Sequence, residues 1–108
     1  MGGLRPIPAR LLPDVMTVRV PTEGGGLGDP VTVTRVRYQR VQAVAEDGHR
    51  SADAGSGTVY VDALNSGGAF EVPAGSRVAI CGHSYLVAAC RRCEDFNGHV
   101  HHWELSVR

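Results

Sequence analysis

Cysteine and histidine residues gather in the last third of the chain, and their types are those that bind zinc. Cys90 and Cys93 form a C-x2-C pair, and His99 is one of three histidines that follow it closely. Cys81 lies one predicted hairpin earlier. Thiolate and imidazole are the ligands that zinc prefers. One interpretation is therefore a small zinc-binding β module held by Cys81, Cys90, Cys93 and a histidine such as His99.

A competing interpretation of the cysteines needs no metal. The histidine spacing fits no common zinc finger, and two ligands three residues apart on a continuous strand point to opposite faces. Chelation by Cys90 and Cys93 would therefore need a turn at Arg91-Arg92. Without it, Cys81 and Cys90 are small buried hydrophobic residues and Cys93 lies in a polar loop. Three cysteines are an odd and sparse set, which predicts no disulfide framework.

Catalytic patterns are weak in this sequence. There is no G-x-S-x-G motif, and Ser56 follows a glycine in a polar segment. The stretch Gly24–Gly28 lacks phosphate-loop spacing, because Asp29 replaces the final glycine and a strand follows instead of a helix. Cys81 and His83 form a dyad only if no hairpin separates them. We therefore expect a protein that is not an enzyme, with no catalytic residue and no cofactor.

Residues 99–108 alternate in the manner of a strand, in which successive side chains point to opposite faces. One predicted face carries apolar residues, begins with His101 and belongs to the core. The other face is mixed and suits a surface or a subunit contact. The two sets are His101, Trp103, Leu105 and Val107 on the core face, and Val100, His102, Glu104 and Ser106 on the outer face.

Short alternating segments separated by glycine and proline predict an all-β fold, a small barrel or sandwich of six to seven short antiparallel strands. A tight hairpin is expected at Gly82-His83. Three prolines exclude a regular helix from residues 1–13, which are expected to form an extended N-terminal arm. Residues 14–108 are then a single β-barrel domain. The expected strands are Asp14–Val20, Val31–Ala45 (one strand or two joined near Tyr38–Arg40), Thr58–Ala63, Arg77–Cys81, Ser84–Cys90 and residues 99–108.

Two polar segments of the chain are expected to differ in mobility. Residues 46–57 contain no large apolar side chain, so nothing offsets the entropy of ordering them and a mobile loop is predicted. Asp62, Asn65 and Ser66 instead occupy a turn that their side chains can stabilise by hydrogen bonding to the backbone.

The charge balance narrows the choice of partners. All eleven basic residues are arginines, and eleven acidic residues bring the formal net charge to zero. No net field would attract DNA or an anionic membrane, although Arg35, Arg37 and Arg40 form a local cluster that could contact DNA or a neighbouring subunit. The zero net charge favours the alternative that these arginines lie on a solvated strand face. No apolar run approaches the ~20 residues of a membrane span and the first residues lack a secretion signal, so we expect a soluble protein made inside the cell.

Four stretches of the chain carry a family resemblance: RPIPARLLPDVMTVRV, VYVDALNS, AGSRVAICGHSYLV and HHWELSV. In this order they resemble the minor capsid proteins of tailed bacteriophages and prophages, and among these the head-completion, or stopper, proteins of the siphophage neck. The resemblance covers nearly the whole chain. Its most specific residues are Val61 and Asp62 before the turn at Asn65 and Ser66, then Gly82, Tyr85 and Val87, and finally His101, His102, Trp103 and Glu104.

The resemblance implies a small β-barrel subunit of a homo-oligomeric ring in the virion, made in the bacterial host cytoplasm. Its implied partners are copies of itself, the portal-adaptor protein, a tail terminator or tail tube protein, and the packaged double-stranded DNA in the channel. The predicted mobile loop would then project into the lumen and retain that DNA. Gly67-Gly68 departs from the family, which often has a proline there, and the Cys90/Cys93 pair is outside its pattern. The candidate lumen residues are Asp47, Gly48, His49, Arg50, Ser51 and Asp53.

A third class, a nucleic-acid-binding barrel, would need aromatic residues interleaved with basic ones on one sheet face. Aromatic residues make up only 6% of the chain, and Tyr60 and Trp103 are expected in core strands. The sequence therefore favours the connector class over this one.

Overall fold

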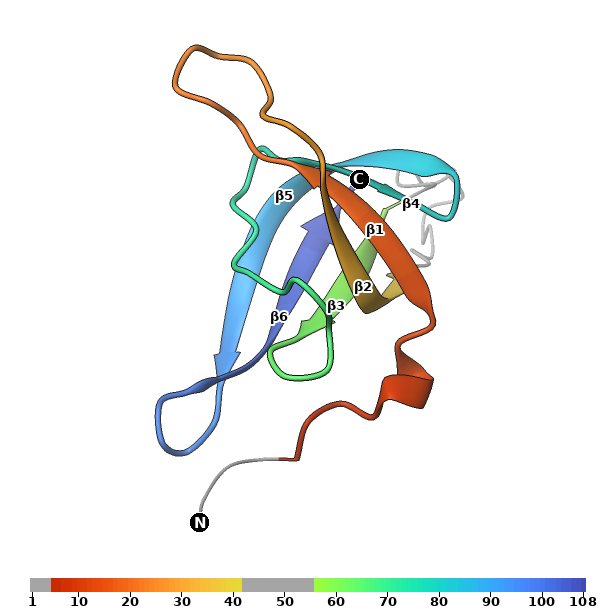
Figure 1. Ribbon diagram of the computed structural model, residues 1–108, viewed down its shortest axis with the longest axis vertical. Helices are drawn as coiled ribbons and strands as arrows, with labels where there is room; N and C mark the ends of the chain where they lie inside the picture. Colours follow the sequence, from red (N-terminus) through yellow and green to blue (C-terminus); the bar gives the residue numbers. More distant parts are fainter. Residues whose placement is uncertain (1–4, 42–55) are drawn as a thin grey trace, which may run out of the picture.

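The backbone closes into a six-stranded antiparallel β-barrel (Figure 1). This computed structural model describes residues 5–41 and 56–108. Around the barrel the strands follow the order β1-β2-β3-β6-β5-β4, and β4 pairs with β1 to close it. The predicted all-β class is confirmed, with a barrel rather than a sandwich. The strands are β1 (Asp14–Arg19), β2 (Val31–Arg40), β3 (Gly57–Asp62), β4 (Arg77–Ile80), β5 (His83–Glu94) and β6 (Val100–Val107).

Alternate residues of the strands fill the barrel interior, as the period-2 pattern predicts. Met16, Val33, Val59 and Leu105 are fully buried, and the Trp103 side chain is 8% exposed. The core is rich in β-branched residues, which pack well on a pleated surface. The interior is therefore a packed core that holds the strands in register and leaves functional groups to the outer surface and the barrel ends.

The longest strand, β5, extends beyond its predicted end at Cys90. Its residues pair with β6 as far as Glu94, opposite Val100. Arg91, Arg92 and Cys93 are polar or small, so the composition predicts a loop there. Tertiary pairing with β6 overrides this local preference, and it places Cys93 in a strand.

The β4–β5 hairpin turns at Cys81 and Gly82, one residue earlier than predicted. Both residues have positive φ, 53° and 80° respectively. A two-residue turn with two positive φ angles matches the twist of the strands that it joins. Gly82 adopts this conformation freely, whereas Cys81 is a non-glycine residue held in the left-handed region.

The β1–β2 connection is an ordered excursion at one end of the barrel (Figure 1). Pro21 and Leu27 form an isolated bridge, and Gly25 turns the chain with a φ of 89°. Thr22 donates its backbone N–H to the Gly26 carbonyl at 2.9 Å. The glycine-rich segment is therefore a small hairpin loop.

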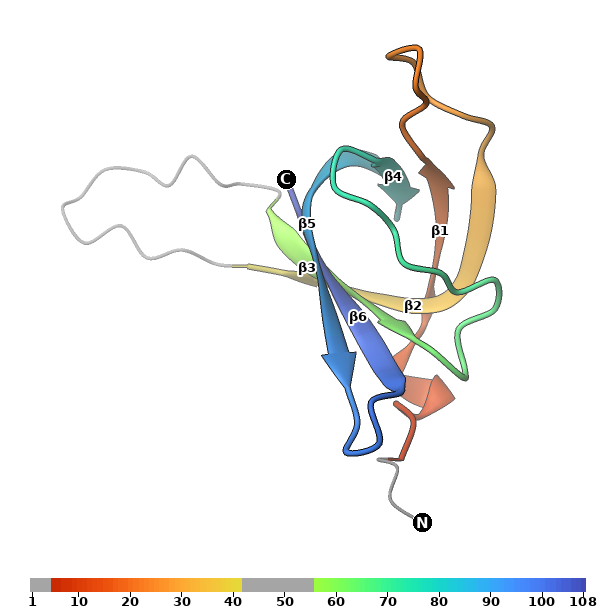
Figure 2. The ribbon, with the colours of Figure 1, turned by 90° about the vertical axis from the view of Figure 1, so that its left-hand side faces the viewer.

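The described part of the N-terminal arm lies at the end of the barrel where β3 ends and β6 begins, and Ile7 and Arg5 hydrogen-bond to that end (Figure 2). One 3-10 turn at Ala9–Leu11 interrupts the expected extended conformation. Pro8 stands at its N-terminal end with a φ of −57°, where its missing N–H is not needed. Among residues 5–41 and 56–108, no helix has the length and hydropathy to cross a membrane.

Candidate functional site

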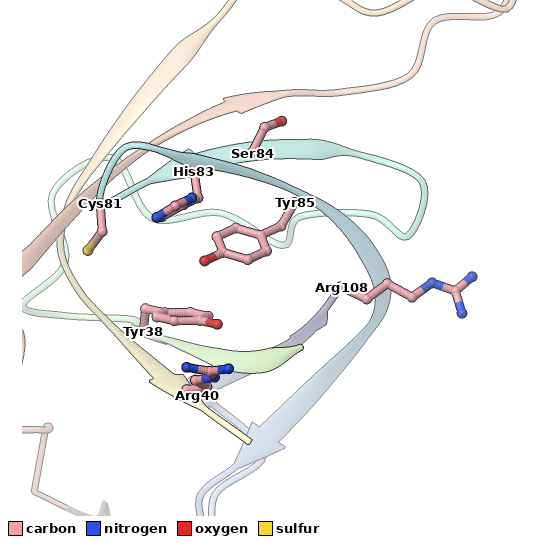
Figure 3. Close-up of a pocket in the computed structure, with 7 residues that line it drawn as sticks. All are labelled: Tyr38, Arg40, Cys81, His83, Ser84, Tyr85 and Arg108. Carbon is pink, nitrogen blue, oxygen red and sulfur yellow. The ribbon is translucent and has the colours of Figure 1, made fainter. Parts of the chain in front are cut away.

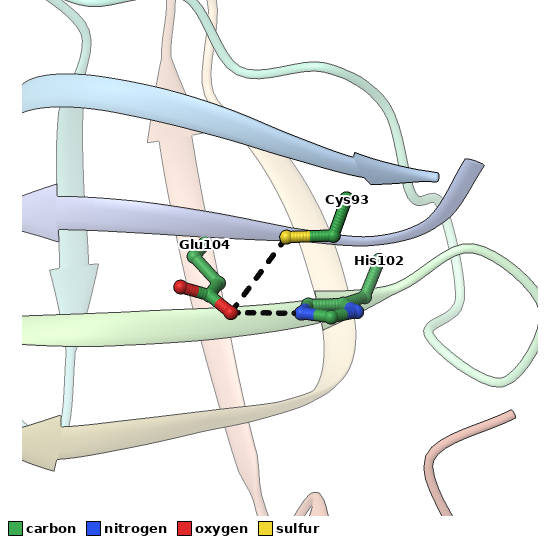
Figure 4. Close-up of side chains that lie close together, drawn as sticks. All are labelled: Cys93, His102 and Glu104. Carbon is green, nitrogen blue, oxygen red and sulfur yellow. Dashed lines mark hydrogen bonds and ion pairs between the residues drawn. The ribbon is translucent and has the colours of Figure 1, made fainter. Parts of the chain in front are cut away.

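Three side chains with metal-binding atoms meet on the outer surface of the barrel (Figure 4). Cys93 lies near the end of β5 directly opposite His102 of β6, and Glu104 follows two residues later on β6. Residues two apart on a strand share a face, so His102 and Glu104 point the same way. Cross-strand pairing then brings the Cys93 side chain to them.

The carboxylate of Glu104 joins the three groups. Its Oε2 lies 2.9 Å from His102 Nε2 and accepts a hydrogen bond from Cys93 Sγ at 3.7 Å. The side chains of His102 and Glu104 are 18% and 29% exposed. On the solvent side, Arg91 Nη1 lies 3.8 Å from Glu104 Oε1. The cluster is thus half-buried and accessible from outside the barrel.

The electrostatics of the cluster shift two pKa values in opposite directions. The hydrogen bond with His102 lowers the pKa of Glu104, although partial burial opposes this. Burial raises the pKa of the Cys93 thiol, and the negative charge of Glu104 raises it further. Without a bound cation, the cluster therefore contains a carboxylate and a protonated thiol at neutral pH.

A β-bulge brings the two adjacent histidines together. β6 contains an extra residue at His101, because Cys93 pairs with His102 while Glu94 pairs with Val100. Bulges re-aim side chains locally, and the two imidazoles meet with their Nδ1 atoms 2.8 Å apart. The sequence predicted His101 on the core face and Val100 on the outer face, and both assignments are wrong. Val100 packs against the core, and His101 is not part of it.

His101 connects the cluster to the N-terminal arm. Its Nε2 lies within hydrogen-bond distance of the Arg5 carbonyl oxygen, 96 residues away in sequence. A chain of contacts therefore runs from Glu104 through His102 and His101 to Arg5. The arm and the surface cluster are parts of one hydrogen-bonded unit.

Asp62 and its turn hold the same arm from a second side. Asp62 is fully buried, and its Oδ1 accepts the Ile7 N–H at 2.9 Å. Its Oδ2 accepts the N–H groups of Leu64 and Asn65 at 3.0 and 2.8 Å. The Asn65 amide donates to the Ile7 carbonyl at 2.8 Å. The predicted turn hydrogen bonds are present, and they also bind the arm.

Ser66 attaches this turn to a bulge in β2. Its hydroxyl accepts the Asp62 N–H at 2.9 Å and donates to the Arg35 carbonyl. Arg35 has a φ of 57° and is the extra residue of a bulge opposite β1. The bulge shifts the alternation, so the buried residue after Val33 is Val36 instead of Arg35.

The predicted zinc ligands do not come together. Cys81 lies in the turn before β5, where its exposed thiol donates to Asp14 Oδ1 at 3.6 Å. Cys93 lies near the far end of the twelve-residue strand, roughly 30–40 Å away along its path. Cys90 faces the core. His99 precedes β6 and is outside the cluster of metal-binding atoms found among the described residues. Cys81, Cys90, Cys93 and His99 therefore do not form the zinc site expected from the sequence. The metal-free interpretation is also wrong for Cys81, which it predicted to be buried and which is exposed.

The three arginines of the predicted basic cluster occupy separate environments. Arg37 donates to the Leu11 carbonyl at 3.4 Å, beside a hollow of about 330 Å³ between the arm and the barrel. Tyr60 lines the same hollow, so it is a partly exposed residue of the outer face and not a core residue. Arg40 instead lines a different hollow. Arg35, Arg37 and Arg40 are all exposed, and their contact with DNA or a neighbouring subunit stays a prediction.

A hollow of about 650 Å³ lies beside Arg40 (Figure 3). Tyr38 and Tyr85 stack across it with ring centroids 5.1 Å apart. Burial and the hydrogen bond with Tyr85 raise the pKa of Tyr38 to about 12. Tyr38 therefore remains neutral at physiological pH, and the two stacked rings provide a flat wall beside the guanidinium of Arg40.

The predicted lumen residues Asp47, Gly48, His49, Arg50, Ser51 and Asp53 lie outside the described residues. The functional residues that sequence reasoning missed are Arg5 and Ile7, which bind through their backbone atoms. No side-chain pattern marks such contacts. Tyr38 was also missed, because its partner Tyr85 is 47 positions away and only barrel closure brings the rings together.

Comparisons of the chain with protein-family models, with curated proteins and with solved structures found no match.

Proposed function

We propose that this chain is a structural subunit of the head-tail connector of a tailed bacteriophage or prophage, a stopper protein of the neck. In this role it forms a homo-oligomeric ring between the portal-adaptor assembly and the tail. The ring retains the packaged double-stranded DNA and provides the docking surface for the tail terminator or tail tube. The protein then resides at the head-tail junction of the virion.

The observation that carries the proposal is the meeting of three resembling stretches at one place in the fold. Ile7 of the first stretch hydrogen-bonds to Asp62 and Asn65 of the second. Arg5 of the first hydrogen-bonds to His101 of the last. If the family resemblance were due to chance, there would be no reason for these separate stretches of sequence to lie together in the fold. Their convergence supports the view that the resemblance reflects one shared structural feature, an arm bound to the barrel end.

The closed barrel restricts how such a subunit binds its neighbours. Each of the six described strands pairs on both sides, so assembly by edge-strand addition is blocked. Contacts must then use the arm, the loops and the outer face. Two loops at the arm end expose large apolar side chains, Leu64 (75%) and Phe96 (86%). Exposed apolar side chains of this kind suit burial in an assembly.

The charge of the chain also suits a channel through which DNA moves. A formal net charge of zero gives little of the phosphate attraction that makes DNA binding tight. A ring of such subunits encircles a duplex without holding it in one register.

The proposal is tested by producing the chain together with the portal and adaptor proteins encoded in the same genome. We expect a ring of this protein stacked on the adaptor ring when the purified assembly is imaged by electron cryomicroscopy. The variant Phe96→Asp serves as a matched comparison, because it changes an exposed loop tip and leaves the core intact. A chain that does not associate with the portal-adaptor assembly contradicts the proposal.

A further inference from the structure

The cluster of Cys93, His102 and Glu104 offers three different donor atoms: a sulfur, an imidazole nitrogen and a carboxylate oxygen. All three atoms lie within 4.8 Å of one another. Sulfur, nitrogen and oxygen donors in a compact set are those of tetrahedral zinc sites, which use thiolate, imidazole and carboxylate ligands. The two strands that carry them belong to the barrel wall, so the donors are fixed on rigid elements.

The spacing of the donors is close to that of a tetrahedral site. Zinc–ligand bonds of about 2.0–2.3 Å at tetrahedral angles separate nitrogen from oxygen by about 3.4 Å and sulfur from oxygen by about 3.6 Å. Here His102 Nε2 and Glu104 Oε2 are 2.9 Å apart, and Cys93 Sγ and Oε2 are 3.7 Å apart. The third pair, the sulfur of Cys93 and the donor nitrogen of His102, lies within 4.8 Å, so small side-chain rotations are needed to bring all three atoms onto one ion.

The hydrogen-bond chain through His101 directs a lone pair into the cluster. The Arg5 carbonyl can only accept, so His101 Nε2 is the donor in that contact. In the neutral imidazole His101 Nδ1 is then an acceptor, and it needs the proton of His102 Nδ1, 2.8 Å away. A neutral His102 that donates through Nδ1 has its Nε2 lone pair available for a metal ion, which would replace the hydrogen bond to Glu104.

A metal ion bound to both His102 Nε2 and Glu104 Oε2 would take the place of the direct contact between these two atoms. A histidine ligand whose other nitrogen donates a hydrogen bond is the usual arrangement around zinc. The contacts of His101 thus supply the supporting interaction that such a site requires.

The surroundings of the cluster allow entry and balance the charge. The side chains of His102 and Glu104 are 18% and 29% exposed, so a hydrated ion reaches them from solvent. The thiolate of Cys93 and the carboxylate of Glu104 together neutralise a divalent ion. The only cation paired with the cluster in the described part of the chain is Arg91, at 3.8 Å from Glu104 and 78% exposed, which can turn away.

We propose that Cys93, His102 and Glu104 form a zinc site with three protein ligands and a fourth position open to solvent. The fourth ligand is water in the isolated chain. This site does not depend on the connector proposal, because every ligand comes from the same barrel wall. It also differs from the ligand set expected from the sequence, with which it shares only Cys93 as a named ligand.

Calorimetric titration with zinc and absorption titration with cobalt(II) test the site in the purified full chain. We expect one ion bound per chain and a thiolate-to-cobalt charge-transfer band. Cys93→Ser should abolish that band. Loss of a residue that only supports a ligand typically weakens metal binding by roughly 10–100-fold. Since His102 and Glu104 are ligands themselves, His102→Gln and Glu104→Gln should each weaken zinc binding by more than this.

Matched controls separate the site from adventitious binding. Cys90→Ser changes the cysteine three positions earlier, which faces the core, and His99→Gln changes a histidine outside the cluster. Both controls should retain the band and the wild-type affinity, with circular dichroism reporting that each variant is folded. The proposal is overturned if the wild-type chain gives no charge-transfer band, or if Cys93→Ser binds as tightly as Cys90→Ser.

Discussion

The buried carboxylate of Asp62 accepts a hydrogen bond from the backbone N–H of Ile7 at 2.9 Å, across 55 positions of sequence. The other carboxylate oxygen caps the turn that follows β3. One side chain therefore terminates a strand, shapes a turn and binds the N-terminal arm. The arm, the turn and the start of β6 behave as one unit in this account.

Substitution of Asp62→Asn tests the importance of the carboxylate. The amide retains only one acceptor oxygen for three backbone donors, and a buried donor without a partner is costly. We expect the free energy of unfolding to fall by about 3 kcal/mol in urea denaturation. Asp29→Asn, an exposed loop position, should change it little. Equal stabilities of the two variants would show that the Asp62 contacts are unimportant.

Release of the arm is the expected effect of Asn65→Ala. This change removes the hydrogen bond to the Ile7 carbonyl and leaves the Asp62 carboxylate in place. Local opening precedes proteolysis of folded proteins, so trypsin should cleave after Arg10 faster than in the wild type. Asn97→Ala, in the β5–β6 loop, is the control and should be cleaved at the wild-type rate. An unchanged rate in Asn65→Ala would mean that the arm is held by other contacts.

The turn that follows β3 approaches β2 so closely at Gly67 that a larger residue does not fit there. Thr34 exchanges two backbone hydrogen bonds with Gly67, at 3.0 and 3.1 Å, so a proline at position 67 would lose one of them. A Cβ at this position would collide with the Thr34 hydroxyl. We expect Gly67→Ala to destabilise the protein by roughly 2 kcal/mol.

A double-mutant cycle makes this test specific. The clash is with the Thr34 hydroxyl, and the Thr34 Cβ is 3.7 Å from the added atom, an ordinary contact. Gly67→Ala should therefore cost much less in a Thr34→Ala background. Gly24→Ala, which meets no atom within 4 Å, is the control. Additive effects of the two substitutions would rule out the clash.

Acid should weaken an ion pair between the β3–β4 connection and β5. Glu71 lies 2.7 Å from Arg92 and accepts a hydrogen bond from Trp103 at 3.1 Å. Both contacts lower the pKa of Glu71 below its ordinary value of 4.5, and the contact with Arg92 has the larger effect. A lowered pKa stabilises the folded state above pH 4.5, and the contribution is lost as the pH falls through the folded-state value.

The comparison of wild type with Glu71→Gln tests this pH dependence. The stability difference between the two proteins should shrink on acidification from neutral pH to about pH 3 in urea denaturation. Glu23→Gln, in the exposed β1–β2 loop, should follow the wild-type profile. A difference that stays constant with pH would exclude Glu71 as the titrating group.

The sequence predicted the barrel well because alternation is a local signal. Strand positions such as Val59 and Leu105 follow directly from the period-2 pattern, and both are buried. Three β-bulges in the described strands were not predicted, since the extra residues Arg35, Ala88 and His101 carry no marker of type or spacing. Each bulge shifted the predicted faces by one residue. These shifts are the main source of error in the fold.

The candidate metal site was predicted only in part, for a related reason. The pair of His102 and Glu104 follows from their shared face, whereas Cys93 was expected in a loop. Its position opposite His102 depends on how far β5 pairs with β6, which is a tertiary property. The contacts of Arg5 and Ile7 use backbone atoms, so residue types could not indicate them.

Inactivation of the gene in the phage or prophage genome that encodes it tests the connector role most directly. Electron microscopy of the resulting particles should show heads without attached tails together with free tails, and the heads should lose their packaged DNA. Supplying the wild-type chain in trans should restore tailed, DNA-filled particles. Normal tailed and infectious particles in the absence of the chain would contradict the account.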